Sequence, residues 1–183
     1  MRNGVNFLRH FAAAALLMLL ASCSPEPVKR AKPVPVPISF HLLSPENSVL
    51  EEKLAEHLRN GGKVESFSEL PPGVRIYPYD SSYVFVEDRV QLDGTDISDL
   101  HIGKDSFANF IIQATLSPAG REKLLQFTGQ NIGRQVAIIN INKNKVLSVP
   151  MIHMKFDSGE IIIFNNPDSN KTKAFYDEIF AME

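Results

Sequence analysis

The chain has 183 residues, of which 44% are hydrophobic and 22% are charged. This composition is typical of a globular protein and excludes a disordered chain, a collagen-like repeat and a membrane protein with several spanning helices. The net charge is −2, and it falls to −4 when Arg2 and Arg9 of the N-terminal segment are removed. Because nucleic-acid binding needs a basic surface, we expect no nucleic-acid partner.

Residues 1–22 have the pattern of a signal peptide. Two arginines precede residues 11–20, a run of ten apolar residues that is too short to span a bilayer as a helix. The next residues, Leu20-Ala21-Ser22-Cys23, resemble the lipobox of bacterial lipoprotein precursors. The resemblance implies cleavage before Cys23 and acylation of Cys23, which is the single cysteine of the chain. We therefore expect a lipid anchor that holds the protein in a membrane.

The residue after the cysteine indicates a location within the bacterial cell envelope. Ser24 stands where enterobacterial lipoproteins that stay in the inner membrane carry an aspartate. By this resemblance we expect a lipid-anchored protein that faces the periplasm, in the outer membrane rather than the inner membrane. Residues 23–37 then form a proline-rich tether, which favours an extended spacer. A single globular domain is predicted over residues 38–183.

The first half of this domain predicts strands and one helix. Residues 38–42 alternate apolar and polar, as a half-buried strand does. Ser48 and Glu51 have the spacing of a capping box that opens a helix, and Gly61-Gly62 ends it. We expect one face of this helix to be buried through Leu50, Leu54 and Leu58. A turn at 71–73 and strands at 83–90 and 107–116 follow.

The second half begins with the clearest helix start in the chain. Ser117 can accept a backbone N–H as the N-cap, and Pro118 is favoured at the first helical position. We expect the helix to end at Gly133. Leu124, Thr128 and Ile132 should share one face with Leu125, and Leu124 and Leu125 should be buried in the core. Strands are predicted at 136–141, 146–149 and 161–164, and a last helix from Ser169 should turn Phe175, Ile179 and Phe180 inward.

The order of these elements from residue 107 is β-α-β-β-β-α. It predicts an α+β fold, a ferredoxin-like sandwich in which a largely antiparallel sheet carries helices packed on one face. We expect residues 107–183 to form one such sheet.

Several segments resemble the head region of the first periplasmic domain of SecD, a subunit of the protein translocase. They are LSPAGREK at 116–123, FTGQNIGR at 127–134, VAII at 136–139 and VLSVP at 146–150, with weaker similarity at Pro72-Gly73, Tyr83-Val84 and LDGTDI at 92–97. The resemblance covers nearly all of the globular part. It implies the fold of that head and a role in contacting polypeptides outside the inner membrane.

The sequence also departs from SecD. The Asp-Gly hairpin of that family is replaced by residues 140–144, and its glycine-rich stretch is reduced to Ser158-Gly159. The six transmembrane helices of SecD, whose charged residues couple export to the proton gradient, have no counterpart in this sequence. The resemblance therefore implies the fold without the motor activity.

No residue pattern indicates a catalytic or metal site. The histidines at 41, 57, 101 and 153 lack the spacing of zinc motifs. Asp93, Asp96 and Asp99 recur every three residues, which differs from a calcium loop, so we expect only that Asp96 or Ser98 caps a short turn. Nucleophile-elbow and phosphate-loop motifs are missing as well. We expect no catalytic residue, no metal and no cofactor.

These patterns favour a non-enzymatic, lipid-anchored interaction module that contacts a protein or peptide partner of the envelope. Its working surface is predicted on the sheet face that the helices leave uncovered, where Asn109, Gln113 and Thr115 oppose the apolar side of the strand. Two alternatives stay open. One is a periplasmic enzyme whose site is assembled from dispersed Asp and His residues, and the other is a structural envelope protein that self-associates through a free sheet edge. The sequence leaves the oligomeric state and the identity of the partner open.

Overall fold

The computed structural model describes residues 35–181, to which all structural statements below refer. Its elements, in chain order, are β1 (Ile38–Leu43), α1 (Asn47–Arg59), η1 (Val64–Ser66), β2 (Val74–Tyr79), β3 (Ser82–Asp93), η2 (Gly94–Asp96), β4 (Ile97–Lys104), β5 (Phe110–Leu116), α2 (Pro118–Gln130), β6 (Val136–Asn140), β7 (Lys145–Ser148), β8 (Glu160–Asn166) and α3 (Ser169–Phe180). Within this part of the chain, none of the helices is long and apolar enough to cross a membrane.

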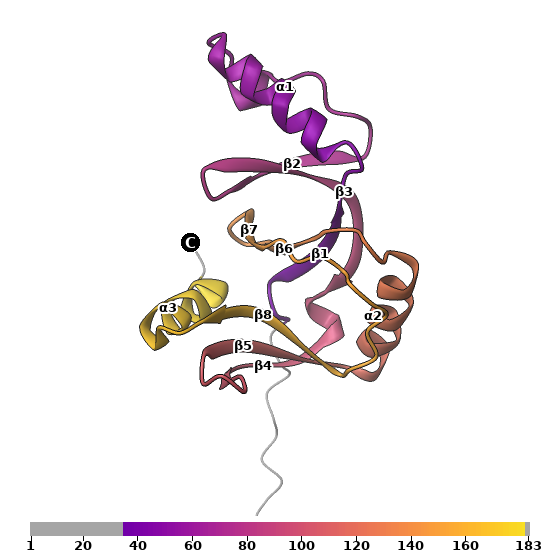
Figure 1. Ribbon diagram of the computed structural model, residues 1–183, viewed down its shortest axis with the longest axis vertical. Helices are drawn as coiled ribbons and strands as arrows, with labels where there is room; N and C mark the ends of the chain where they lie inside the picture. Colours follow the sequence, from indigo (N-terminus) through magenta and orange to yellow (C-terminus); the bar gives the residue numbers. More distant parts are fainter. Residues whose placement is uncertain (1–34, 182–183) are drawn as a thin grey trace, which may run out of the picture. The chain divides into compact units, whose positions relative to one another are not determined.

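The strands form two antiparallel sheets. One has five strands in the order β2-β3-β1-β6-β7, and the other has three in the order β4-β5-β8. The main apolar core includes residues from both sheets, such as Ile38 and Phe40 of β1 and Ile112 and Ala114 of β5. Figure 1 shows the three-stranded sheet at one end of the domain, with α1 at the other end.

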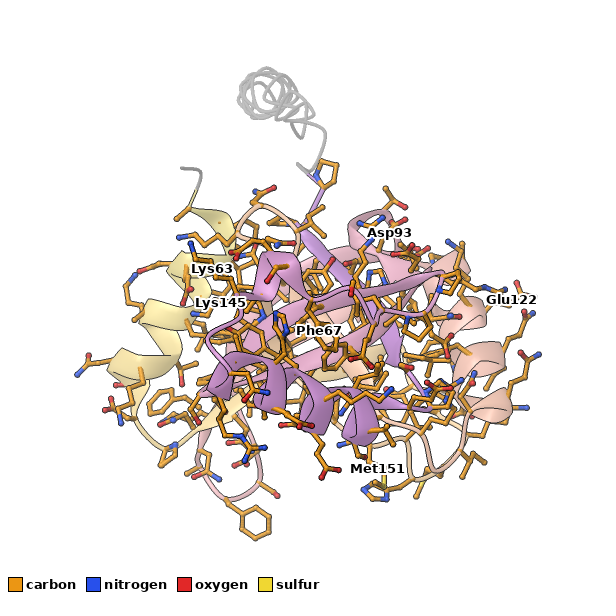
Figure 2. All side chains as sticks on the ribbon, turned by 90° about the horizontal axis from the view of Figure 1, so that it is seen from above. Lys63, Phe67, Asp93, Glu122, Lys145 and Met151 are labelled. Carbon is orange, nitrogen blue, oxygen red and sulfur yellow. The ribbon has the colours of Figure 1, made fainter. Side chains whose placement is uncertain are left out.

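The five-stranded sheet is curled. Its edge strands β2 and β7 contact each other, and a second apolar cluster fills the inside of the curl. Helix α1 packs against β3, where its Leu50 and Leu54 join Phe67 and Phe85 in a third cluster. Figure 2 looks onto this helix and shows Phe67 beside it.

The three-stranded sheet has one face in the core and one face turned outward. Ile112 and Ala114 of β5 are fully buried in the main core, as is Ile179 of α3. Tyr176 of α3 donates its hydroxyl proton to the carbonyl oxygen of Leu100 on β4 at 2.9 Å. Helix α3 therefore lies on the inner face, and the opposite face is free of helices in the described domain (Figure 1).

Helix α2 begins as the sequence predicts. The hydroxyl oxygen of Ser117 accepts the backbone N–H of Gly120 at 3.1 Å, and Pro118 is the first helical residue. Leu124 and Thr128 are buried. The helix ends at Gln130, three residues earlier than expected, and Ile132 lies beyond it with 57% of its surface exposed. The expectation that Ile132 continues the helix face of Leu124 and Thr128 is therefore wrong.

The α+β class with largely antiparallel sheets is confirmed, but the single sheet expected over residues 107–183 is not found. Strands β5 and β8 belong to the three-stranded sheet, whereas β6 and β7 belong to the five-stranded one. The capping box expected at Ser48 is also wrong. Helix α1 starts at Asn47, two residues earlier than an N-cap at Ser48 implies, and the side-chain oxygen of Asn47 accepts the backbone N–H of Phe85 at 2.8 Å. Phe180, expected inside, is 39% exposed.

Candidate functional site: the outward face of the three-stranded sheet

The outward face of β4-β5-β8 is built by alternation along each strand. On β5 the core side chains of Ile112 and Ala114 are followed by Gln113 and Thr115 on the other side. The strand register places the neighbours of these two residues in cross-strand rows. The rows are His101, Gln113 and Ile162, and Asp99, Thr115 and Glu160.

Polar pairs occupy two places on this face. The amide nitrogen of Gln113 donates to the carboxylate of Glu160 on β8. On β4, Nδ1 of His101 lies 3.1 Å from Oδ2 of Asp99. Gln113 is half-buried, whereas His101, Asp99 and Glu160 are exposed. These groups give the face hydrogen-bonding capacity without a large net charge.

A shallow hollow of about 450 Å³ lies at the β8 side of this face. Its lining combines polar and apolar side chains: Gln113, Phe156, Ser158, Glu160, Ile161 and Ile162. Ile162 is 53% exposed, and Phe156 is exposed beside it. An exposed isoleucine and phenylalanine next to amide and hydroxyl groups suit a peptide, which presents both apolar side chains and backbone polar groups.

The structure brings together two of the three predicted surface residues. Gln113 and Thr115 share the outward face, but Asn109 lies before β5 in the turn from β4. There its amide donates to Oδ2 of Asp105 at 3.0 Å, and its backbone N–H donates to Oδ1 of the same carboxylate at 2.9 Å. Asn109 therefore shapes the turn, and its expected place on the sheet face is wrong.

The same carboxylate organises the whole β4–β5 turn. Asp105 accepts from the backbone N–H of Phe107 and from the side chain of Asn165 as well. These hydrogen bonds lower the pKa of Asp105, the bond from the Asn109 amide first. Ala108 takes a left-handed backbone conformation at φ +63° within this turn. The turn is thus fixed by side-chain hydrogen bonds rather than by a glycine.

A second hollow, of about 420 Å³, lies away from the sheet face. It is lined by Pro78, Tyr79, Asp80, Lys145, Val146, Leu147, Phe164 and Phe175. Phe164 and Phe175 stack with their ring centroids 4.1 Å apart, and Lys145 is already paired with Glu178 of α3 at 2.7 Å. The aromatic groups are thus engaged in packing α3 onto β8.

His41 is the one histidine of the described residues that is buried. Its Nδ1 lies 2.9 Å from the carbonyl oxygen of Glu87, which can only accept, so Nδ1 carries the proton. Its Nε2 then accepts from the hydroxyl of Ser39 at 3.0 Å. Burial is the main cause that lowers the pKa of His41. Ser39 and His41 are both buried, and neither lines the two hollows described above. The pair therefore satisfies its own hydrogen bonds inside the curled sheet.

Asp96 caps a short turn, as expected, and Asp93 caps it as well. Asp93 accepts from the backbone N–H of Thr95 at 2.8 Å, and Asp96 accepts from the backbone N–H of Asp93 at 3.1 Å. Asp99 stands apart on β4. Within residues 35–181, no group of three or more His, Cys, Asp or Glu side chains could hold a metal ion. Cys23 and the predicted signal peptide lie outside the described residues.

Sequence reasoning missed Ile162, Glu160 and Phe156 as parts of the face. Their place depends on the pairing of β8 with β5, which is irregular between Ile112 and Gln113. The alternation of polar and apolar residues in β5 could reveal one strand of the face, but it could not reveal which strand lies beside it.

One comparison with known proteins identifies a protein family. The family model for the SecDF P1 head subdomain matches residues 74–175, from the start of β2 into α3. Two solved structures match with 22% identity and a TM-score of 0.49 each. The first, described as "Crystal structure of SecDF in Super-membrane-facing form", is matched over 74% of this chain and 17% of that chain. The second, described as "Structure and function of a membrane component SecDF that enhances protein export", is matched over 75% and 59%.

This chain thus spans less than two thirds of either SecDF structure. The comparison with curated proteins found no match. The family match covers more than half of the chain and includes the strands that build the outward face. The chain belongs to the SecDF P1 head subdomain family.

Proposed function

We propose that this domain is a lipid-anchored protein-interaction module that holds a stretch of extended polypeptide against the outward face of its three-stranded sheet. Cys23 carries the anchor, and the domain faces the periplasm, with the outer membrane favoured. The module has neither enzymatic nor motor activity. One solved relative is described as a membrane component that enhances protein export, and this supports a partner of polypeptide nature.

The observation that carries the proposal is the mixed chemistry of the uncovered face. Ile162 and Phe156 offer exposed apolar surface, and Gln113 and Glu160 offer hydrogen-bonding groups within the same hollow. An extended peptide needs both kinds of contact, because its side chains alternate and its backbone groups stay polar. A buried catalytic group in a cavity would favour an enzyme, but the buried Ser39–His41 pair lines neither hollow.

Site-specific photo-crosslinking in the protein's own cells tests this proposal. A photoreactive amino acid at position 162 should capture polypeptides of the envelope. The matched control is position 49 on α1, because Val49 and Ile162 are both 53% exposed. Equal capture from both positions would contradict a specific surface on the sheet.

Two double variants that add positive charge provide a second test of the proposal. Gln113→Lys together with Thr115→Lys should reduce capture from position 162, since two ammonium groups would occupy the face. The control, Gln126→Lys together with Gln130→Lys, places the same charges on exposed positions of α2. Both double variants should keep the thermal stability of the wild type. Undiminished capture by the folded sheet variant would remove the sheet face from consideration.

A further inference from the structure

The loop between β7 and β8 contains both methionines of the described chain. Methionine is usually a core residue that fills irregular gaps. Met151 and Met154 instead are 47% and 65% exposed, and the side chain between them, His153, is exposed too. Figure 2 shows Met151 at the periphery of the domain. Three side chains with soft or borderline donor atoms therefore lie within four consecutive residues on the surface.

The backbone of this loop is held at its start by the segment that follows α2. Ile152 donates its N–H to the carbonyl oxygen of Arg134 at 2.9 Å and accepts from the N–H of Gly133 at 2.7 Å. Met151 forms an antiparallel bridge with Gln135. These contacts make residues 150–152 an extended, paired segment, with the Ile152 side chain buried.

Alternation along this segment brings two donors to the same side. In an extended chain, residues i and i+2 project to one face while residue i+1 projects to the other. Ile152 projects into the core, so Met151 and His153 project outward together. The backbone bends at Met154. The bend adds a second thioether directly after the imidazole.

The loop is also held at its far end. Phe156 donates its backbone N–H to the hydroxyl oxygen of Thr128 on α2 at 2.9 Å, and the carbonyl oxygen of Asp157 accepts from Nε of Arg121 at 2.7 Å. The start of the segment that carries the three donors is therefore hydrogen-bonded to the residues after α2, and its far end is hydrogen-bonded to α2 itself. This restraint reduces the conformational entropy that the loop would lose on holding a ligand.

We propose that Met151, His153 and Met154 form a binding site for a soft monovalent metal ion, Cu(I) or its redox-inert analogue Ag(I). Thioether sulfur is a soft ligand that selects Cu(I), and imidazole nitrogen also suits copper. Zn²⁺, Mg²⁺ and Ca²⁺ prefer thiolate, imidazole or carboxylate groups, which are not clustered in the described residues. The proposal assigns binding alone and no redox step, and it does not depend on the polypeptide surface proposed above.

The test is a titration of the full chain with Cu(I) under anaerobic conditions, in competition with a chromogenic Cu(I) chelator. We expect one ion per chain. Met151→Leu and Met154→Leu keep the side-chain volume and remove the sulfur, and His153→Gln removes the imidazole. Each should weaken Cu(I) binding at least tenfold, because even residues that only support a metal ligand cost about 10–100-fold when replaced. His101→Gln, an exposed histidine on β4, should leave the affinity unchanged.

Two further measurements keep the result specific. An unmodified thiol at Cys23 would itself bind Cu(I), so the titration is repeated with Cys23→Ser, which should retain the site. In addition, Ag(I) should shift the ε-methyl NMR signals of Met151 and Met154, assigned through the two Leu variants. Failure to bind one ion in the Cys23→Ser chain, or the same affinity after all three donors are replaced, would overturn the proposal.

Discussion

The ammonium nitrogen of Lys123 on α2 lies 2.8 Å from Oδ1 and 3.0 Å from Oδ2 of Asp96, a residue of η2 that is only 3% exposed. The same carboxylate accepts the backbone N–H of Asp93, and the Asp96 carbonyl oxygen accepts the N–H of Ser117, the N-cap of α2. One buried aspartate thus connects the turn after β3 to the start of α2, two segments that are far apart in the sequence.

Replacing this aspartate should destabilise the domain. Asp96→Ala leaves the N–H of Asp93 without its acceptor and the Lys123 ammonium without its partner. The expected loss is about 2 kcal/mol of unfolding free energy, the usual cost of an unsatisfied buried polar group. Urea unfolding measures it, with Asp99→Ala on the exposed side of β4 as the control. Equal stability of the two variants would show that the buried contacts contribute nothing.

A glycine of α2 packs directly on this turn. A Cβ atom at Gly120 would lie 2.3 Å from the carbonyl oxygen of Asp96. Gly120→Ala should therefore destabilise the domain by about 1–3 kcal/mol although alanine favours helices. Gly129→Ala is the control in the same helix, because its Cβ would meet only the flexible side chain of Lys155 at 3.4 Å. Thermal unfolding should show a lower midpoint for Gly120→Ala and an unchanged or higher one for Gly129→Ala.

The buried face of α2 can be tested by truncation. Leu124 is 5% exposed within the main core, so Leu124→Ala should cost about 2–5 kcal/mol. Leu125→Ala, at a half-buried neighbouring position, should cost clearly less. Chemical denaturation of both variants gives the comparison. A loss of unfolding free energy near zero for Leu124→Ala would contradict the burial of this helix face in the core.

Stability should depend on pH through His41. Burial lowers the pKa of its imidazole in the folded state, so the unfolded chain, with a histidine pKa of about 6.5, binds the proton first as the pH falls. Stability is therefore complete above about pH 6.5 and is lost as the pH drops toward the lower folded-state pKa. His41→Gln should flatten this part of the profile of urea midpoint against pH. An unchanged slope in the variant would assign the effect to other groups.

Lipidation can be examined by mass spectrometry of the protein from its own cells. We expect Cys23 to be the N-terminal residue and to carry acyl chains, because the lipobox and the short apolar run point to the same cleavage position. Cys23→Ser should leave the signal peptide uncleaved and the chain without acyl groups. A processed, membrane-bound Cys23→Ser protein would contradict the anchor.

Sequence reasoning succeeded where the physical cause is local. The Ser117–Pro118 start of α2 and the end of α1 before Gly61, which has φ +83°, depend on neighbouring residues alone. Gln113 and Thr115 share one face because alternation acts within a single strand.

The errors concern contacts between distant segments. Helix α1 starts at Asn47, whose side chain is hydrogen-bonded to Phe85 on β3. The side-chain amide of Asn109 is hydrogen-bonded to Asp105 in the β4–β5 turn. The division of the strands between two sheets likewise depends on which strands pair. The periodicity of the sequence does not indicate which strands pair, because β5, β6 and β8 all present apolar residues to the same core.

The place of β1 in the five-stranded sheet has a consequence for how the chain folds. This strand is the first element of the domain, yet it lies between β3 and β6, and Ser39 pairs with Ile139. Pairings of such high contact order slow folding, because a long loop must close before they form. β1 is therefore synthesised before the other strands of the domain, but it cannot pair with β6 until most of the domain has been synthesised.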